Sequence, residues 1–284
     1  VGNEDSVSER NWQQNPTILS GDLMGNDFIE DYRKPQNQVD NSEHIVRGAN
    51  HALLDGFILQ SGASLSEGGA IWNSNITEGL HFKNLILKHN FAANKGGAIY
   101  NSNASPEFEN IYFFFNVVGS DAQKAQGGAA IYNHSSSPIM QDLVFEQNYA
   151  YGDGGAIYNQ FSDPVIKNAV FTLNSADDHE GGAIYNRSSN PQFYQVSFYN
   201  NKDKNGKNGI YNQASSPRLI NVLSWQSDFV NTGESSPKLL GTSKALSNPF
   251  MNISDLDGPD NLWFSEDDGM RLNDLATGLE QGII

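Results

Sequence analysis

The chain has 284 residues and no cysteine. It contains 17 Lys and Arg residues and 33 Asp and Glu residues, which gives a formal net charge of −16. This charge repels phosphate groups, so we expect no nucleic-acid partner, and the lack of cysteine excludes thiol chemistry and Cys-ligated metal. No run of 18 apolar residues is present, so we expect no direct membrane insertion.

One hexapeptide dominates the sequence from residue 67 onward. It reads GGAIWN at 68–73, GGAAIYN at 127–133 and GGAIYN at 96–101, 154–159 and 181–186. The closing Asn residues are 28, 32, 26, 27 and 26 residues apart, and a set of prolines keeps the same step. A repeat of this length is typical of a solenoid built from stacked coils. The residues in the Asn column are Asn73, Asn101, Asn133, Asn159, Asn186 and Asn212.

Alternation by two within each unit indicates strands with one buried face. Apolar residues stand two and five positions after each proline, and seven positions after the first four, and helical spacing is not sustained. We therefore expect the strand AIYN, a corner ending in Pro and two further short strands in each unit. The third apolar column is Phe113, Phe145, Phe171 and Phe198, and we expect these rings to stack inside from coil to coil.

These features predict an all-β chain that forms a single right-handed parallel β-helix, with three strands per coil and a repeat of about 26 residues. We expect N-terminal coils at 1–66, regular repeats at 67–243 and a C-terminal capping segment at 244–284. The Gly-Gly pair would supply positive φ and close approach between coils. The Asn columns would lie at bends, as hydrogen-bonded ladders or simple turn residues. The second such column is Asn90, Asn116, Asn148, Asn174 and Asn201.

The combination of GGAI with the motif F-x-x-N, as in Phe113 to Asn116, resembles the repeat of chlamydial polymorphic outer-membrane proteins. The same signature is found in many exported bacterial right-handed β-helix proteins. The stretches RNWQQNPTILSGDL (10–23) and LLDGF (53–57) are similar to the N-terminal coils of that broader group, and DLDGPDNLWFSEDDGMRL (255–272) is similar to its closing segment. The resemblance implies a β-helix at the cell surface or outside the cell.

An aromatic residue follows the Ile of each repeat. Since Ile is the better core residue, alternation predicts that the rings point outward, where they could stack on sugars or contact a partner. The alternative is that the stacked rings only stiffen the sheet or lie beneath a loop. The predicted binding residues are Trp72, Tyr100, Tyr132, Tyr158, Tyr185 and Tyr211.

Two acidic groups are candidate calcium sites, because Ca²⁺ prefers oxygen ligands in flexible loops. Asp153 and Glu180 precede Gly-Gly in neighbouring coils, where two carboxylates repel unless a cation or a proton intervenes. The alternative is a solvated acidic rim. The closing segment supplies the second group. Its Gly falls at the fourth position of the twelve and not the sixth, so it is no EF-hand, and the open alternatives are a looser calcium loop or a polar cap over the last strand edge. The second group is Asp255, Asp257 and Asp260.

The sequence favours a non-enzymatic exported surface, adhesive or assembly module, whose β-helix face binds a glycan or a cell-surface protein, or supports self-association. The alternative is a carbohydrate-active β-helix enzyme, either a polysaccharide lyase or a glycoside hydrolase. Asp177, Asp178 and Glu180 are the catalytic candidates, but they lie in one loop and not on separate strands. A groove gathering three or more acids with a Lys or Arg would favour the enzyme.

Overall fold

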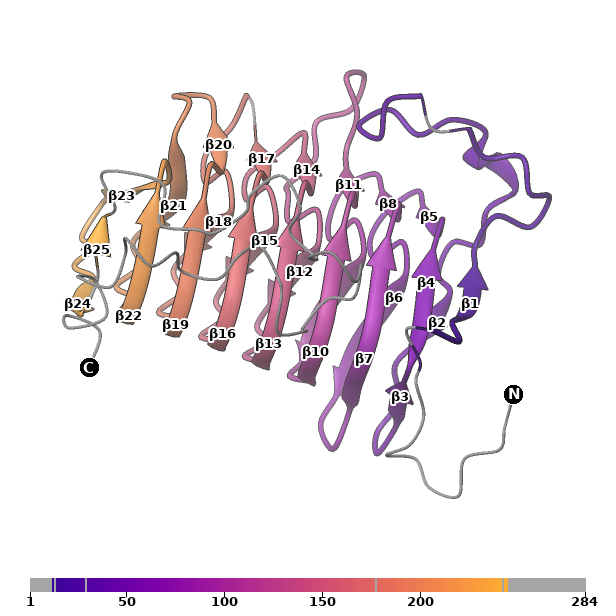
Figure 1. Cartoon of the computed structure of the whole chain (residues 1–284), viewed down its shortest axis with the longest axis horizontal. Coiled ribbons are helices and arrows are strands. Elements are labelled where there is room, and N and C mark those ends of the chain that lie inside the picture. Colours follow the sequence, from indigo (N-terminus) through magenta and orange to yellow (C-terminus); the bar gives the residue numbers. More distant parts are fainter. Residues whose placement is uncertain (1–11, 13, 29, 177, 242, 245–284) are drawn as a thin grey trace.

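The computed structural model describes residues 12, 14–28, 30–176, 178–241 and 243–244. Parallel strands stack as a β-helix of about seven turns with three sheets, and the described residues contain no α-helix (Figure 1). The predicted fold class is therefore confirmed. The predicted capping segment, 244–284, lies outside the described residues apart from Lys244.

The coil uses one sheet of long strands and two sheets of shorter strands. The eleven-stranded sheet contains β1 (Thr17–Ser20), β3 (Leu53–Asp55), β4 (Phe57–Gln60), β7 (His81–Lys88), β10 (Glu107–Phe114), β13 (Ile139–Glu146), β16 (Val165–Thr172), β19 (Gln192–Tyr199), β22 (Arg218–Trp225), β24 (Lys238–Leu240) and β25 (Ser243–Lys244). The eight-stranded sheet contains β2 (Val46–Arg47), β6 (Ile71–Ile76), β9 (Ile99–Ala104), β12 (Ile131–His134), β15 (Ile157–Gln160), β18 (Ile184–Arg187), β21 (Asn208–Gln213) and β23 (Asp228–Thr232). The six-stranded sheet contains β5 (Ala63–Ser64), β8 (Phe91–Ala92), β11 (Val117–Val118), β14 (Tyr149–Ala150), β17 (Ser175–Ala176) and β20 (Lys202–Asp203). A short 3-10 turn, η2 (Gln38–Asp40), lies in the loop between β1 and β2.

The predicted core columns are confirmed, because identical positions of successive coils pair directly. Phe113 pairs with Phe145, and Phe145 pairs with Phe171. Their ring centroids are 4.7 and 4.5 Å apart, with the planes within 4° of parallel. All three rings are fully buried. The spacing of the coils is thus also the spacing of aromatic stacking.

Two Asn ladders run through the interior and connect the coils. Each side-chain Nδ2 donates to Oδ1 of the Asn in the next coil, at 2.8–2.9 Å from Asn73 to Asn212, and the ladder continues to Asn231. The second ladder runs from Asn90 to Asn201 at 2.9–3.0 Å and ends on Ser227. Every bond points toward the C-terminus, so the ladders are directional.

The structure changes the expected location of the first Asn column. These residues lie inside strands, as Asn73 does in β6, and the bend comes two residues later, at left-handed residues such as Asn103. The second column does lie at bends, each Asn following a residue with positive φ such as His89. The first column is therefore interior packing satisfied by hydrogen bonds, and not turn chemistry.

The two glycines of the repeated motif have different roles. Gly154 has φ +69°, and a Cβ there would lie 2.3 Å from the Ile157 carbonyl oxygen. Gly155 needs no positive φ, but a Cβ would lie 2.0 Å from the carbonyl oxygen of Gly182 in the next coil. The first glycine thus makes the tight re-entry into the strand, and the second allows the coils to approach.

Candidate functional site

The aromatic column lies on the outer side of the eight-stranded sheet. Tyr132 pairs with Tyr100 on one side and Tyr158 on the other. The Tyr132 and Tyr158 ring centroids are 4.7 Å apart with planes 11° from parallel. The neighbouring Ile side chains belong to the main core, whereas the four central tyrosines form a separate cluster flanked by Trp72 and Tyr211. The predicted alternation of Ile inward and ring outward is confirmed.

The expectation that these rings are exposed is wrong. Tyr100, Tyr132, Tyr158 and Tyr185 are only 7, 0, 4 and 6% exposed. Stacking covers both faces of each inner ring, and charged side chains lie beside the row, since Lys95 Nζ is 5.6 Å from the ring centroids of both Tyr100 and Tyr132. The column is therefore a buried aromatic layer, which cannot itself offer an apolar strip to a partner.

Two rows of polar side chains flank the aromatic column. One row stands directly after each ladder Asn and is paired in register from coil to coil: Ser102, His134, Gln160, Arg187 and Gln213. The other precedes each Gly-Gly pair: Glu67, Lys95, Gln126, Asp153 and Glu180. Sequence reasoning missed the first row, although its position after AIYN in every repeat is visible in the sequence.

The tyrosine hydroxyls hold these polar side chains in place. The Tyr132 hydroxyl lies 2.9 Å from Gln126 Oε1 and 2.8 Å from Gln160 Oε1. The Tyr185 hydroxyl donates to Gln213 Oε1 at 2.9 Å. Gln126 and Gln213 nevertheless remain exposed. The arrangement is a row of anchored amides with unused hydrogen-bonding capacity facing solvent.

Burial determines the ionisation of the tyrosines. Desolvation raises the pKa of Tyr132 and Tyr185 far above the usual value for phenols, and that of Tyr158 less strongly. The Arg187 guanidinium hydrogen-bonds to Tyr158, which opposes the desolvation and keeps the pKa of the arginine high. The hydroxyls are therefore neutral donors, and Arg187 is a fixed, exposed cation on this face.

The predicted pair of acids is brought together, but each carboxylate has partners within the chain. Asp153 Oδ1 accepts from the backbone N–H of Glu180 at 3.1 Å and lies 3.8 Å from His179 Nδ1. Glu180 Oε1 forms an ion pair with Lys204 Nζ at 2.7 Å. Burial raises the pKa of Asp153, and the negative charge of Glu180 adds to the increase. Among the described residues no group of three His, Cys, Asp or Glu side chains is placed to hold a metal ion.

The remaining candidates are dispersed or outside the described part. Asp178 is exposed, and Asp177 lies outside the described residues, as do Asp255, Asp257 and Asp260. The described residues thus place two acids, Asp153 and Glu180, beside one lysine. The three-acid groove that would favour an enzyme is not formed by these residues.

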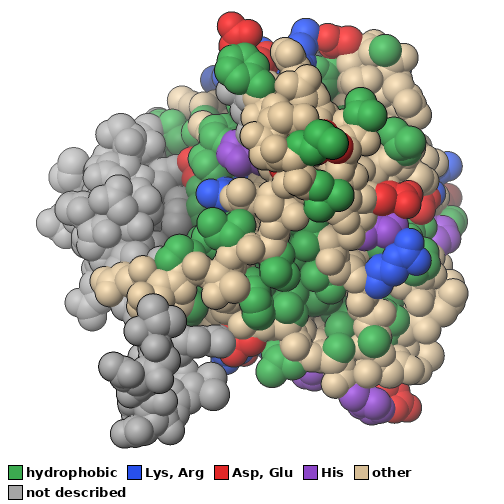
Figure 2. All heavy atoms as spheres, turned by 90° about the vertical axis from the view of Figure 1, so that its right-hand side faces the viewer, with side chains coloured by type: hydrophobic (Ala, Val, Ile, Leu, Met, Phe, Trp, Pro, Cys, Tyr) green, Lys and Arg blue, Asp and Glu red, His purple; other side chains and the backbone are tan. Residues whose placement is uncertain are grey.

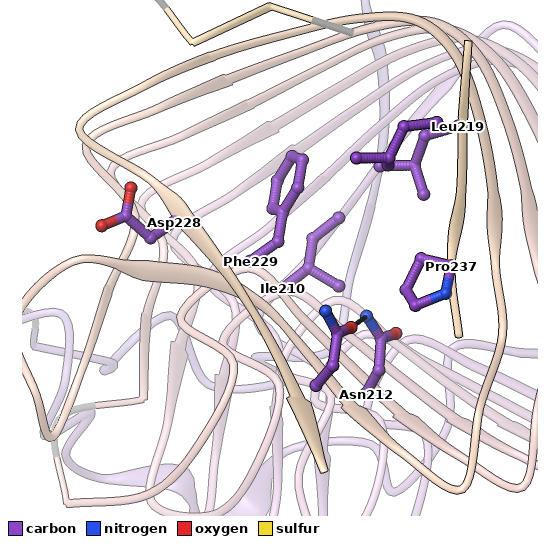
Figure 3. Close-up of a pocket in the computed structure, with 8 residues that line it drawn as sticks. Ile210, Asn212, Leu219, Asp228, Phe229 and Pro237 are labelled. Atoms are coloured by element: carbon purple, nitrogen blue, oxygen red, sulfur yellow. Dashed lines mark hydrogen bonds between the residues drawn. The ribbon is translucent and has the colours of Figure 1, made fainter. Parts of the chain in front are cut away.

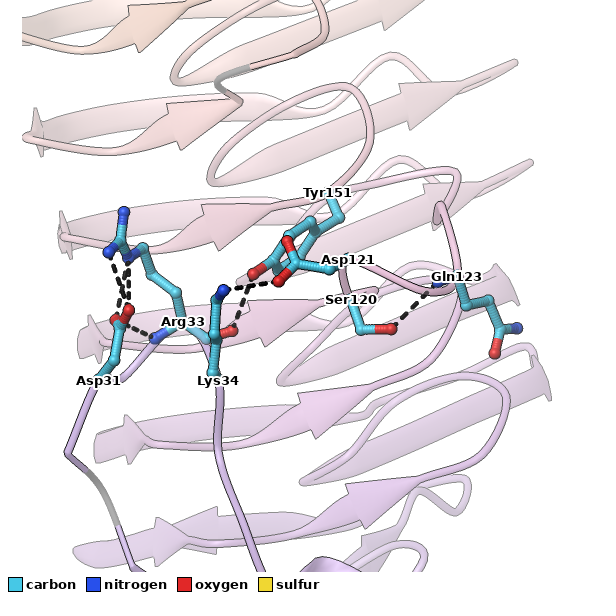
Figure 4. A network of polar contacts seen from close by, with 7 residues as sticks. All are labelled: Asp31, Arg33, Lys34, Ser120, Asp121, Gln123 and Tyr151. Carbon is cyan, nitrogen blue, oxygen red and sulfur yellow. Dashed lines mark hydrogen bonds and ion pairs between the residues drawn. The ribbon is translucent and has the colours of Figure 1, made fainter.

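A long loop between β1 and β2 packs against coils far away in sequence (Figure 4). Lys34 forms an ion pair with Asp121 at 2.6 Å, and the Tyr151 hydroxyl donates to the Arg33 carbonyl at 3.4 Å. The Tyr32 ring lies 4.3 Å from that of Phe115. The sequence analysis did not foresee this packing, because no repeat position marks it. The loop covers part of the outer side of the six-stranded sheet.

Comparison with known proteins supports the repeat assignment. The family model of the Chlamydia polymorphic membrane protein repeat matches residues 84–102 and 142–160. No curated protein and no solved structure is similar enough to count as a match. Within the part of the chain that the structure describes, no helix is long and apolar enough to cross a membrane. Two stretches of the chain thus match this repeat, and the chain is a parallel β-helix repeat protein that resembles the polymorphic membrane proteins.

Proposed function

We propose that the protein is a non-enzymatic, exported surface module that binds a neutral glycan along the outer side of its eight-stranded sheet. The binding surface consists of the two polar rows above the tyrosine column, with Gln126, Gln160, Arg187 and Gln213 at its centre. The observation that carries the proposal is the anchoring of these side chains by the Tyr132, Tyr158 and Tyr185 hydroxyls.

A chain of sugars presents hydroxyl groups at regular intervals, and these groups donate and accept hydrogen bonds. Amides and a guanidinium repeated at the spacing of the coils, about 4.8 Å, offer matching donors and acceptors. Because their positions are fixed by buried hydroxyls, little side-chain entropy is lost on binding. The formal net charge of −16 disfavours an anionic glycan, which is why we propose a neutral one.

The enzyme alternative receives less support from the site geometry. Asp153 and Glu180 are engaged by a backbone N–H and by Lys204. A retaining or inverting glycosidase needs two carboxyl groups free to act on opposite sides of a bond. Because both carboxylates already have partners, the pair favours a structural role. This favours glycan binding over glycan cleavage as the activity of the outer side of the eight-stranded sheet.

The test combines a glycan array with titration calorimetry on the full chain. For a glycan that binds, the double variant Gln160→Ala/Arg187→Ala should weaken affinity by tenfold or more. The matched control is Gln141→Ala/Lys167→Ala, which removes an exposed amide and an exposed cation from neighbouring coils of the eleven-stranded sheet. The control should bind as the wild type does.

Several outcomes would overturn the proposal. Binding that survives the Gln160/Arg187 variant would place the glycan elsewhere on the molecule. No binding to any array glycan, together with capture of a cell-surface protein, would replace the glycan with a protein partner. The appearance of new reducing ends or unsaturated products from a bound glycan would establish the enzyme alternative.

A further inference from the structure

We propose that the C-terminal segment of this chain, residues 245–284, packs over one half of the outer face of the eleven-stranded sheet. Three features of the molecule support this packing: the burial of that half among the described residues, the place where the described chain ends, and the length and composition of the segment that follows. The face concerned is separate from the glycan surface, which lies on the eight-stranded sheet.

Each eight-residue strand of this sheet is divided by a residue with positive φ, which is Asp142 in β13. Before this residue burial alternates, as expected for a strand with one solvated face: Ile139 and Gln141 are exposed, and Met140 between them is buried. After it the alternation stops. The next four residues, 143–146, are all buried, although only every second one can point into the coil. Consecutive buried positions are typical of a strand that is covered on both faces.

The outward side chains of this second half are buried without being part of the core. Phe145 points into the coil, so its neighbours Val144 and Glu146 point outward, yet they are only 6 and 8% exposed. A carboxylate is rarely buried so deeply at an open surface. Among the described residues, the apolar members of the strip belong to none of the three core clusters. This outward strip consists of Tyr112, Val144, Glu146, Thr172, Tyr199 and Leu223.

Described parts of the molecule do not account for this cover. Among the described strands, those in extensive contact with β10, β13, β16 and β19 are their neighbours within the sheet. The loop between β1 and β2 lies over the six-stranded sheet instead, where Lys34 reaches Asp121. Apolar side chains are left open elsewhere: Figure 2 shows hydrophobic side chains across the N-terminal end, and Val39 and Leu65 in the first coils are completely and 90% exposed. The burial of the outward strip therefore requires a specific cover.

The described chain ends beside this half of the sheet. β25 pairs with Leu223 and Ser224, in the second half of β22. Forty residues follow, 245–284. Four coil steps separate β22 from β10, which is about 19 Å at roughly 4.8 Å per step, and an extended chain crosses that distance in about six residues. The segment thus starts in the right place and is long enough to cross the sheet more than once.

The segment contains the apolar side chains that this contact requires. Its run Leu262-Trp263-Phe264 is uncharged, and Phe250 and Met251 precede it. Large apolar side chains of this kind are stabilised by burial against an apolar surface. The outward strip offers such a surface, with Tyr112 and Tyr199 at its two ends and Val144 between them.

The other place for the segment is the open end of the coil. The interior opens there into a pocket of about 470 Å³, whose lining includes Ile210, Leu219 and Phe229 (Figure 3). A segment that only closed this end would leave the outward strip uncovered. The burial of the strip therefore favours the sheet over the end as the position of the segment.

Thiol reactivity in the full chain tests the cover, because the chain has no cysteine of its own. Val144→Cys should react with a small maleimide at least about tenfold more slowly than Ile139→Cys in the same strand, since a covered thiol reacts only after local opening. Adding Trp263→Asp/Phe264→Asp should raise the rate of the first variant and leave that of the second unchanged. Val39→Asp/Leu65→Asp makes the same chemical change at the N-terminal end and should alter neither rate.

Photo-cross-linking identifies what covers the strip. Benzophenone maleimide attached to Lys167→Cys, at the exposed border of the covered half, should capture peptides of 245–284 from the same molecule. Attached to the exposed position of Gln213→Cys, on the eight-stranded sheet in the turn that contains β22, it should capture few. A segment that moved freely would be captured at both positions. Capture at Leu239→Cys but not at Lys167→Cys would place the segment at the open end and overturn the proposal.

Three further outcomes would overturn the proposal. Equal maleimide rates for Val144→Cys and Ile139→Cys would show that the face is open. Peptides captured from other parts of the chain would assign the cover to those parts. Peptides captured from a second molecule, recognised in a mixture of isotope-labelled and unlabelled protein, would assign it to a second copy. Circular dichroism and the melting temperature establish that each variant folds, and Trp263→Ser replaces the double Asp variant if that one does not.

Discussion

Asn133 donates its Nδ2 hydrogen to Oδ1 of Asn159, 2.9 Å away in the next coil, and both side chains are completely buried. Asn159 in turn donates to Asn186 at 2.9 Å. A buried amide is costly to desolvate, and the bond to the next coil offsets that cost only when the neighbour is also present. The ladder therefore makes the stability of each coil depend on the presence of the next coil.

Asn159→Ala should destabilise the protein by about 2–6 kcal/mol, because it leaves a buried donor on Asn133 and a buried acceptor on Asn186, each worth about 1–3 kcal/mol. Urea-induced unfolding gives the free-energy change. Gln141→Ala, on the exposed side of β13, is the control and should cost little. A loss for Asn159→Ala no larger than that of the control would mean that water or rearrangement satisfies the two orphaned groups.

Phe145→Ala should cost about 3–5 kcal/mol, since it removes a ring stacked between Phe113 and Phe171 and leaves a cavity in the core. Urea-induced unfolding measures this free-energy change as well. Ile139→Ala in the same strand is the control, because Ile139 is 47% exposed and points away from the core. Equal losses for the two variants would contradict the inward direction of the Phe column.

Gly154→Ala and Gly25→Ala separate backbone strain from steric clash. The two glycines have nearly the same φ, +69° and +66°, but an added Cβ meets the Ile157 carbonyl at 2.3 Å in the first case and nothing within 4 Å in the second. Gly25→Ala should cost about 1 kcal/mol from the left-handed backbone alone. Gly154→Ala should cost clearly more, and equal costs in thermal unfolding would disprove the steric role of the first glycine.

Alkaline pH should destabilise the fold through the tyrosine column. Because burial raises the pKa of Tyr132 and Tyr185 above that of the unfolded chain, near 10, the folded state keeps protons that the unfolded state releases. Stability should be constant below about pH 10 and fall above it. The melting temperature of Tyr132→Phe/Tyr185→Phe should fall less steeply from pH 9 to 11.5, and identical slopes would contradict the raised pKa values.

Acidic pH should destabilise the fold through His89. Burial against Phe114 and Phe115 lowers its pKa to about 4, so the neutral imidazole is the form that fits the fold. The unfolded chain takes up a proton near pH 6.5, and the stability contribution is lost progressively as pH falls from there toward 4. His89→Asn, which tolerates the positive φ of this position, should flatten the pH dependence of urea unfolding in that window. An unchanged profile would place the acid sensitivity elsewhere.

The fold could be predicted from the sequence because each element of it is local and repeated. Alternation placed Ile71 and its equivalents inside and the rings outside, and the structure agrees. Exposure could not be read from the same pattern. Whether Tyr132 reaches solvent depends on Lys95, Gln126 and Gln160, which come from three different coils. Periodicity assigns a side chain to a face, but it does not show what lies above that face.

Features without a repeat were beyond sequence reasoning. The contact of Lys34 with Asp121 joins residues from a loop and a coil that share no periodic position. The acids Asp153 and Glu180 were correctly placed in neighbouring coils, yet their engagement by His179 and Lys204 depends on side-chain conformations that spacing does not determine. The geometry of the site thus required coordinates, whereas the architecture did not.

The Asn ladder also shows where this protein tolerates added sequence. Asn101 and Asn133 are separated by 32 residues and Asn133 and Asn159 by 26, yet both hydrogen bonds are 2.9 Å long. The additional residues of the longer repeat lie in the exposed turn around Asp121–Lys124, outside the coil. An epitope or a small peptide ligand inserted there would project from a rigid framework whose internal spacing does not change. The molecule is in that sense a ready-made display scaffold, in which the presented segment can be altered independently of the frame.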